Sequence, residues 1–203
     1  MKILFKWAGI FVIPSVLFFL YQYEVLGEIS EEQQGLFMIV HYLSAGIAVY
    51  FTLIELKKKS IEKVSFMRYM ITAILSTVSH GLMFGLISGL YFNVYNPAAR
   101  VKYVDETLRP AIVRGFDSTA NTKAEYYDHL MVGKDSGVLV PERYAEYRQA
   151  AEDSLAKVDD IIKQISDRNF SISGNIISWV GFAPFIGILF GAIVTVFITK
   201  RND

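Results

Sequence analysis

Hydrophobic residues occur in four long runs along this chain, and most charged residues lie between the runs. The clearest run covers residues 68–95 and carries no charge after Arg68. As a helix, it is long enough to cross the hydrocarbon core of a bilayer, which is roughly 30 Å thick. We therefore predict a membrane-spanning helix here.

Three further runs predict one span each, at residues 1–23, 36–56 and 175–199. A cleaved signal peptide is an alternative for the first run. However, the bulky Tyr21 and Tyr23 follow it where a small-x-small cleavage site would be needed, so we expect a retained span. Pro14 and Pro184 lie inside the first and last runs, and each removes a backbone hydrogen bond, so we expect a kink at both.

Small residues recur every fourth position in the third span, and the last span carries a second small-xxx-small face. Such faces allow helix backbones to pack closely in a membrane. We therefore expect the third span to pack against another helix, most closely the last one. The positions are Ala73, Thr77, Gly81, Gly85, Gly89, Gly187 and Gly191.

Charges at the ends of the runs predict the orientation in the membrane. The connector at 24–35 carries four glutamates and no basic residue, whereas the connector at 57–68 carries five basic residues. Short basic loops stay in the cytoplasm. We therefore place both termini in the cytoplasm, with the last span returning inward to Lys200 and Arg201.

The long polar region at 96–174 then lies on the outer side. An Asn-Pro step at 96–97 breaks the chain before a new helix, Thr122 and Glu125 match a capping box, and the longest polar helix covers 141–167. We expect the first and last of these helices to pair through apolar stripes. The stripes are Val101, Val104, Leu108 and Ile112, and Tyr144, Tyr147, Ala151, Leu155, Val158, Ile162 and Ile165.

The sequence thus predicts an all-α membrane protein with four transmembrane helices and an extramembrane helical insert between the third and fourth. Its parts are residues 1–95, 96–174 and 175–203. Hydrophobic residues make up 53% of the chain, which favours the lipid bilayer as its surroundings. Twenty basic and twenty acidic residues cancel, so no overall field attracts nucleic acid. The chain has no cysteine, which excludes disulfides and thiolate sites.

Two histidines are candidates for an intramembrane polar site. His80 lies near the middle of the third span, and His41 lies near the entry of the second. A proton relay or a ligand contact would be the functional interpretation of His80. We favour a structural one, a hydrogen bond from neutral His80 to Ser or Thr on a neighbouring helix, because no carboxylate lies at that depth. His41 is expected to be interfacial or paired across helices.

No residue pattern specifies a catalytic reaction, a cofactor or a metal site. Glu125, Asp128 and His129 share a predicted helix, but a zinc site needs three or four convergent ligands, so we expect solvated surface. We expect Tyr144 and Tyr147 to pack in a core. Nucleophile elbows and phosphate-binding glycine loops are absent from the sequence, so enzymatic activity has no support.

Several landmarks coincide along the chain, and their order resembles a known family. They are Ser65 and Phe66 after the basic connector, Tyr91 and Tyr95 before Asn96 and Pro97, the helical insert, and Pro184 and Gly187 in the last span. The pattern resembles the bacterial inner-membrane family known as domain of unknown function 4199, over essentially the whole chain. The resemblance implies a four-span inner-membrane protein of Gram-negative bacteria with a periplasmic insert, and no catalytic residues.

Two main hypotheses for function follow. The first is a non-enzymatic accessory or scaffold subunit of an inner-membrane complex, with the insert as a periplasmic docking domain for a membrane-protein partner or a second copy. The second is a small transporter or transporter-like subunit that uses His80 and the glycine-rich helices. An enzyme acting on lipid is a third, and an aqueous cavity with convergent polar groups would be its minimum requirement.

Overall fold

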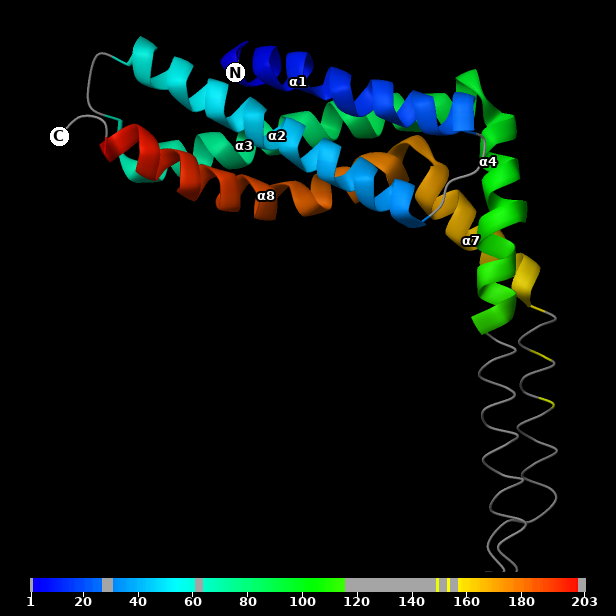
Figure 1. Cartoon of the computed structure of the whole chain (residues 1–203). Coiled ribbons are helices and arrows are strands. Elements are labelled where there is room, and N and C mark those ends of the chain that lie inside the picture. The colour runs from blue at the N-terminus through cyan, green and yellow to red at the C-terminus, as the bar shows by residue number, and fades with distance from the viewer. Residues whose placement is uncertain are drawn as a thin grey trace, which may run out of the picture. The chain divides into compact units, whose positions relative to one another are not determined.

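The structure is a computed structural model that describes residues 2–26, 31–60, 64–115, 149, 153 and 157–200. Within these ranges the chain is helical apart from a few linking residues, and they contain no strand. The chain divides into two compact units (Figure 1). Met1–Asn96 and Asn169–Asp203 form the first unit, and Pro97–Arg168 forms the second.

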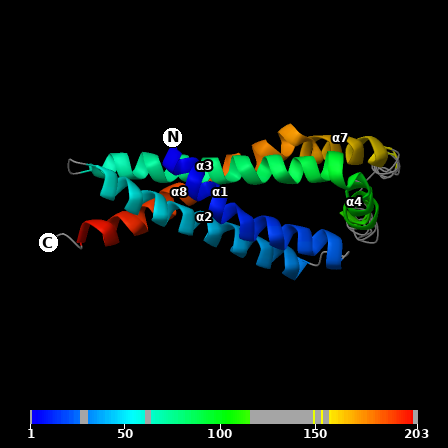
Figure 2. The same cartoon turned by 90° about the horizontal axis from the view of Figure 1, so that it is seen from above.

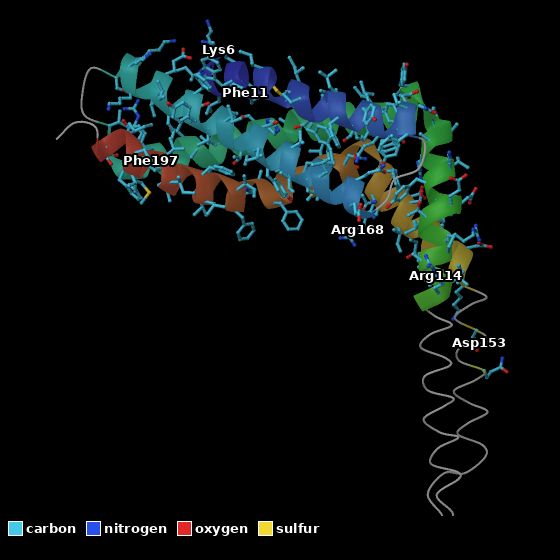
Figure 3. The ribbon with its side chains drawn as sticks, viewed as in Figure 1. Lys6, Phe11, Arg114, Asp153, Arg168 and Phe197 are labelled. Atoms are coloured by element: carbon cyan, nitrogen blue, oxygen red, sulfur yellow. The ribbon has the colours of Figure 1, made fainter. Side chains whose placement is uncertain are left out.

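Four helices of the first unit are long and apolar enough to cross a membrane. They are α1 (Lys2–Leu20) with its π-helical extension η1 (Tyr21–Leu26), α2 (Glu31–Lys59), α3 (Phe66–Leu90) with its π-helical extension η2 (Tyr91–Tyr95), and α8 (Ile172–Lys200). Large apolar side chains such as Phe197 point outward from these helices (Figure 3), as lipid-facing residues do. The all-α class is confirmed, and so are four helices long and apolar enough to span a membrane. That they cross one, and in which orientation, stays a prediction.

The polar residues just before the second and the fourth predicted spans are largely helical. Residues 31–35 form the first turns of α2, and residues 168–175 are helical except at Ser171. Glutamate and glutamine are good helix formers, so the polar residues 31–35 can form the first turns of α2. At the other connector the Ser171 hydroxyl accepts a hydrogen bond from the Gly174 N–H at 3.0 Å and caps α8. Each of these spans therefore begins earlier than predicted.

Neither proline ends its helix, because α1 continues through Pro14 and α8 through Pro184, and the kinks expected there stay predictions. Irregular backbone occurs where α1 and α3 end, in the π-helical turns η1 and η2. The Asn96 N–H donates to the Tyr91 carbonyl oxygen at 2.8 Å, which is the five-residue spacing of a π-helix. The hydrophobic pattern did not predict these turns.

Among the described elements, the helices α3 and α8 make the most extensive contact, and glycines line it. A methyl group added at Gly85 would lie 2.7 Å from the Ile176 Cα, and one added at Gly187 would lie 2.6 Å from the Ile74 Cα. Folded proteins do not allow carbon atoms so close. The small-residue faces of the two helices are therefore in backbone contact with each other.

The second span, α2, packs on both of these helices, and α1 lies along α2 in both ribbon views (Figure 1, Figure 2). Gly46 of α2 leaves the space that the Phe190 ring of α8 occupies. One core cluster joins three helices, and it consists of Val49, Leu53, Tyr69, Ala73, Val194 and Ile198. This core packs at the end of the α3–α8 contact where α3 begins and α8 ends.

A charged cluster joins α1 to the end of α2. The Glu55 carboxylate pairs with Lys6 at 2.9 Å and with Lys59 at 2.6 Å, and it accepts a hydrogen bond from the Trp7 indole at 2.5 Å. Lys6 also lies over the Trp7 ring, 4.3 Å from its centre. The acidic residue at this basic end of the bundle is therefore neutralised by its neighbours.

The second unit contains α4 (Pro97–Tyr103), the π-helical turn η3 (Val104–Leu108), further helix at 109–115, and α7 (Val158–Phe170) up to Arg168. Arg100 pairs with Asp167 at 2.7 Å, and Arg109 pairs with Asp159 at 2.5 Å. Because the partner number falls as the arginine number rises, the two helical segments run antiparallel. The hydrogen bond that Arg109 donates to the Asp159 carboxylate also raises the pKa of Arg109.

The apolar stripes of this unit agree only in part with the prediction. Val158 and Ile162 of α7 are buried, but Val101 is exposed. Arg100 reaches Ser166 and Asp167 of α7, and one residue along a helix turns the next side chain by about 100°, so Val101 faces away. Several predicted features lie outside the described residues, namely the capping box of Thr122 and Glu125 and the stripe residues Tyr144, Tyr147, Ala151 and Leu155.

We predict that Gly85→Leu lowers the thermal stability of the protein in detergent, because the new side chain meets the α8 backbone. Overpacking typically costs about 1–3 kcal/mol, and a backbone contact cannot relax by a rotamer change. Gly181→Leu is the matched control, since a methyl group added at Gly181 meets nothing within 4 Å. Equal melting temperatures for the two variants would contradict the close α3–α8 contact.

Candidate functional site

The two histidines of the spans lie next to each other in the first unit. His41 belongs to the buried face of α2 that continues through Ala45 and Ala48, and His80 belongs to the buried face of α3 with Ser76 and Phe84. The ring centres of His41 and His80 are 4.9 Å apart, with the ring planes at 59°. Sequence reasoning named both residues but did not predict that they meet.

Both rings are removed from solvent, with His41 3% exposed and His80 1% exposed. Nδ1 of His41 and both ring nitrogens of His80 have no hydrogen-bond partner among the described residues. The Ala8 backbone approaches His80, but it does not reach hydrogen-bond geometry. The predicted hydrogen bond from His80 to Ser or Thr of a neighbouring helix is therefore not formed within the described residues.

Aromatic rings from three helices surround the histidine pair. The Trp179 ring of α8 lies 4.5 Å from His41, and the Phe84 ring of α3 lies 4.8 Å from both His41 and Trp179. Phe37, one turn before His41 in α2, packs on His41, Phe84 and Trp179. The sequence did not single out Trp179, because a tryptophan in an apolar run is usually a lipid or core residue.

A small cavity opens beside the pair, between α2, α3 and α8. Its volume is about 10 Å³, close to the space that one water molecule or one bare ion needs. Its walls include His41 and His80, with Tyr42, Thr77 and Trp179 around them. The Thr77 hydroxyl is engaged elsewhere, since it lies 2.7 Å from the Ala183 carbonyl oxygen. His41 and His80, whose rings carry nitrogens without a partner among the described residues, are thus both part of its lining.

Most other buried polar groups of the spans are satisfied. Thr52 and Ser76 share a hydrogen bond of 3.2 Å between α2 and α3, and the Ser88 hydroxyl donates to Asn175 of α8 at 3.0 Å. Two hydroxyls, those of Ser15 and Thr195, are buried without a partner among the described residues. The histidine pair differs from these hydroxyls because it brings several such atoms together beside one cavity.

A second polar cluster lies where the irregular turns η1 and η2 meet. The buried Tyr91 donates its hydroxyl hydrogen to the Glu24 carboxylate at 2.7 Å, and the Asn96 amide donates to the same oxygen at 3.1 Å. Every polar group in this cluster has a partner, so it fastens the ends of α1 and α3. The sequence signal for it was the unusual Glu24 directly after an apolar run.

The other predicted features of the insert cannot be placed. Glu125, Asp128 and His129 lie outside the described residues, as do Tyr126 and Tyr127. Within the described ranges, no three His, Cys, Asp or Glu side chains converge as metal ligands. No family model, curated protein or solved structure matches this chain in the comparisons with known proteins.

We predict that His80→Leu raises the thermal stability of the protein. A buried polar group without a partner costs about 1–3 kcal/mol, and leucine has no such group. Thr52→Val is the control of opposite sign, because it leaves the buried Ser76 hydroxyl without its partner. If differential scanning calorimetry finds His80→Leu as destabilised as Thr52→Val, the His80 nitrogens are satisfied after all.

Proposed function

We propose that this chain is a non-enzymatic accessory or scaffold subunit of a bacterial inner-membrane complex. The observation that carries the proposal is the division into two helical units, one built of four apolar helices and one with charged, exposed surfaces. The first unit anchors the chain in the lipid bilayer. The second serves as a periplasmic docking domain for a membrane-protein partner or for another copy of the chain.

The charges at the helix ends support the proposed orientation. Three lysines fill the last turn of α2, and Lys200 ends α8, so basic residues mark the ends assigned to the cytoplasm. Glu24, Glu31 and Glu32 lie at the opposite ends of α1 and α2. This arrangement follows the positive-inside rule with both termini in the cytoplasm.

The small-residue faces do not serve the proposed partner, because α3 and α8 use them against each other. Partner contact therefore falls on the second unit. Its ion pairs Arg100–Asp167 and Arg109–Asp159 are partly to largely exposed, so water screens them and they contribute little to stability. Such pairs can exchange partners at low cost, which suits a surface that docks through charges.

We predict that a cysteine at Asp153 reacts with a membrane-impermeant maleimide in intact spheroplasts, since the insert lies in the periplasm. The native chain has no cysteine, so the label reports one position. Lys58→Cys is the control, because its exposed side chain sits at the proposed cytoplasmic end of α2 and should react only after lysis. The reverse pattern would overturn the orientation.

We also predict that a photo-crosslinking residue at Gln149 or Asp153 captures a specific protein in native membranes, seen as a discrete band and identified by mass spectrometry. The same residue at Ile162, which is buried, should give no adduct. A chain that remains monomeric without an adduct at either exposed position contradicts the scaffold proposal.

The second candidate function is a small transporter or transporter-like subunit. The specific observation that favours it is the histidine pair beside a cavity in the middle of the bundle. Polar groups inside a membrane often mark the path of a transported species. The scaffold proposal ranks first because the cavity is small and aromatic rings enclose the pair.

A further inference from the structure

One row of side chains on the outer face of α2 ends in a basic residue. Leu43, Ile47 and Tyr50 are exposed along this row. At about 100° per residue, the row continues through the half-buried Ile54 to Lys58, which is also exposed. Lys58 therefore lies at the end of a helix face that meets acyl chains when the helix is in a bilayer.

Two further helices have the same arrangement. On α3, the exposed Arg68 lies one turn before the exposed Ile71 and two turns before the exposed Leu75. On α1, the exposed Lys6 lies one turn before the exposed Ile10. Each apolar row thus has a cation at one of its ends.

These cations lie at the same end of the bundle (Figure 1). Residues 60–65 connect the end of α2 to the start of α3, and Lys6 of α1 pairs with Glu55 near the end of α2. Among the described residues at this end, Glu55 is the single carboxylate, and it pairs with Lys6 and Lys59. Lys58 and Arg68 have no carboxylate partner within the described residues. We call this the basic end of the bundle.

The opposite end of the same rows carries the opposite charge. The exposed Glu32 lies one turn before Leu36 at the start of the outer face of α2, and the exposed Glu24 follows α1 in η1. The described residues of the first unit include no lysine or arginine at that end. An anionic surface is therefore attracted to one end of the bundle and repelled by the other.

We propose that the basic end binds anionic phospholipids, with Lys58 and Arg68 as the main contacts of their phosphate headgroups. A phospholipid whose acyl chains lie along an apolar row places its headgroup beside the cation that ends the row. The long aliphatic stems of lysine and arginine let the charge reach the headgroup while the stem stays on apolar surface. Basic residues near a membrane surface favour anionic over zwitterionic lipids.

The membrane orientation of the chain does not by itself account for this placement. The positive-inside rule counts basic residues in a short loop and does not depend on which helix face carries them. Lys59 satisfies that rule while it faces Glu55, whereas Lys58 of the same turn continues the lipid-facing row. The inference rests on the bilayer anchor of the proposed function, and it names a lipid class as the partner of the first unit.

The experiment uses full-length protein in detergent, incubated with equal amounts of phosphatidylglycerol and phosphatidylethanolamine that have the same acyl chains. Native mass spectrometry then counts the retained lipids of each kind. We expect phosphatidylglycerol to exceed phosphatidylethanolamine about fivefold or more, the factor that one basic residue near an anionic headgroup contributes. Excess inorganic phosphate should not release the lipid, because the acyl chains also hold it.

Three variants locate the contact. Lys58→Gln and Arg68→Gln should each reduce the preference for phosphatidylglycerol, and the double variant should retain the two lipids about equally. Lys59→Gln is the matched control, because it removes the same charge from the same turn of α2 but from the face that Glu55 neutralises. It should keep the preference of the native protein. A circular dichroism melt shows that each variant is folded.

Four results would overturn the proposal. The native protein could retain both lipids equally, the double variant could keep the native preference, Lys59→Gln could lose as much as Lys58→Gln, or inorganic phosphate could release the lipid. A native protein that retains neither lipid contradicts the bilayer anchor as well. The crosslinking result at Gln149 and Asp153 is independent, so failure of the lipid site and failure of the scaffold role are distinguishable.

Discussion

The close approach of the α3 and α8 backbones is the constraint on which the rest of the spanning unit depends. Lipid tails are as apolar as leucine, so burial of side chains drives helix association only weakly in a membrane. Van der Waals contact between backbones must supply the attraction, and only glycine allows it at Gly85 and Gly187. The Thr77 hydroxyl adds a hydrogen bond of 2.7 Å across the same contact.

The other two spans take their positions from this pair. Gly46 lets α2 approach the Phe190 ring of α8, and Thr52 of α2 bonds to Ser76 of α3. These contacts fix the rotation of α2 about its axis, which points His41 toward His80 and Trp179. The histidine pair is thus a consequence of helix packing far from the rings, and a change in the glycine contact would also move it.

Much of the spanning unit could be predicted from the sequence, because a bilayer imposes length and polarity on each helix. The glycine spacing of α3 also indicated which face would be in contact. The predicted start of α2 was too late, because the polar residues Glu31 and Glu32 have high helix propensity and belong to its first turn. The meeting of His41 and His80 could not be predicted, since it depends on the rotation of two helices that share no sequence pattern. Trp179 was missed for the same reason.

Polar side chains in the spans fall into two chemical groups. Several serine and threonine hydroxyls bond to their own helix, as Ser79 does with the Leu75 carbonyl oxygen at 2.8 Å. Nδ1 of His41 and both ring nitrogens of His80 make no such bond within the described residues. Leucine or phenylalanine would fill the same space without such nitrogens. The chain keeps two histidines there, side by side, and this stability cost is the physical reason to assign them a role beyond packing.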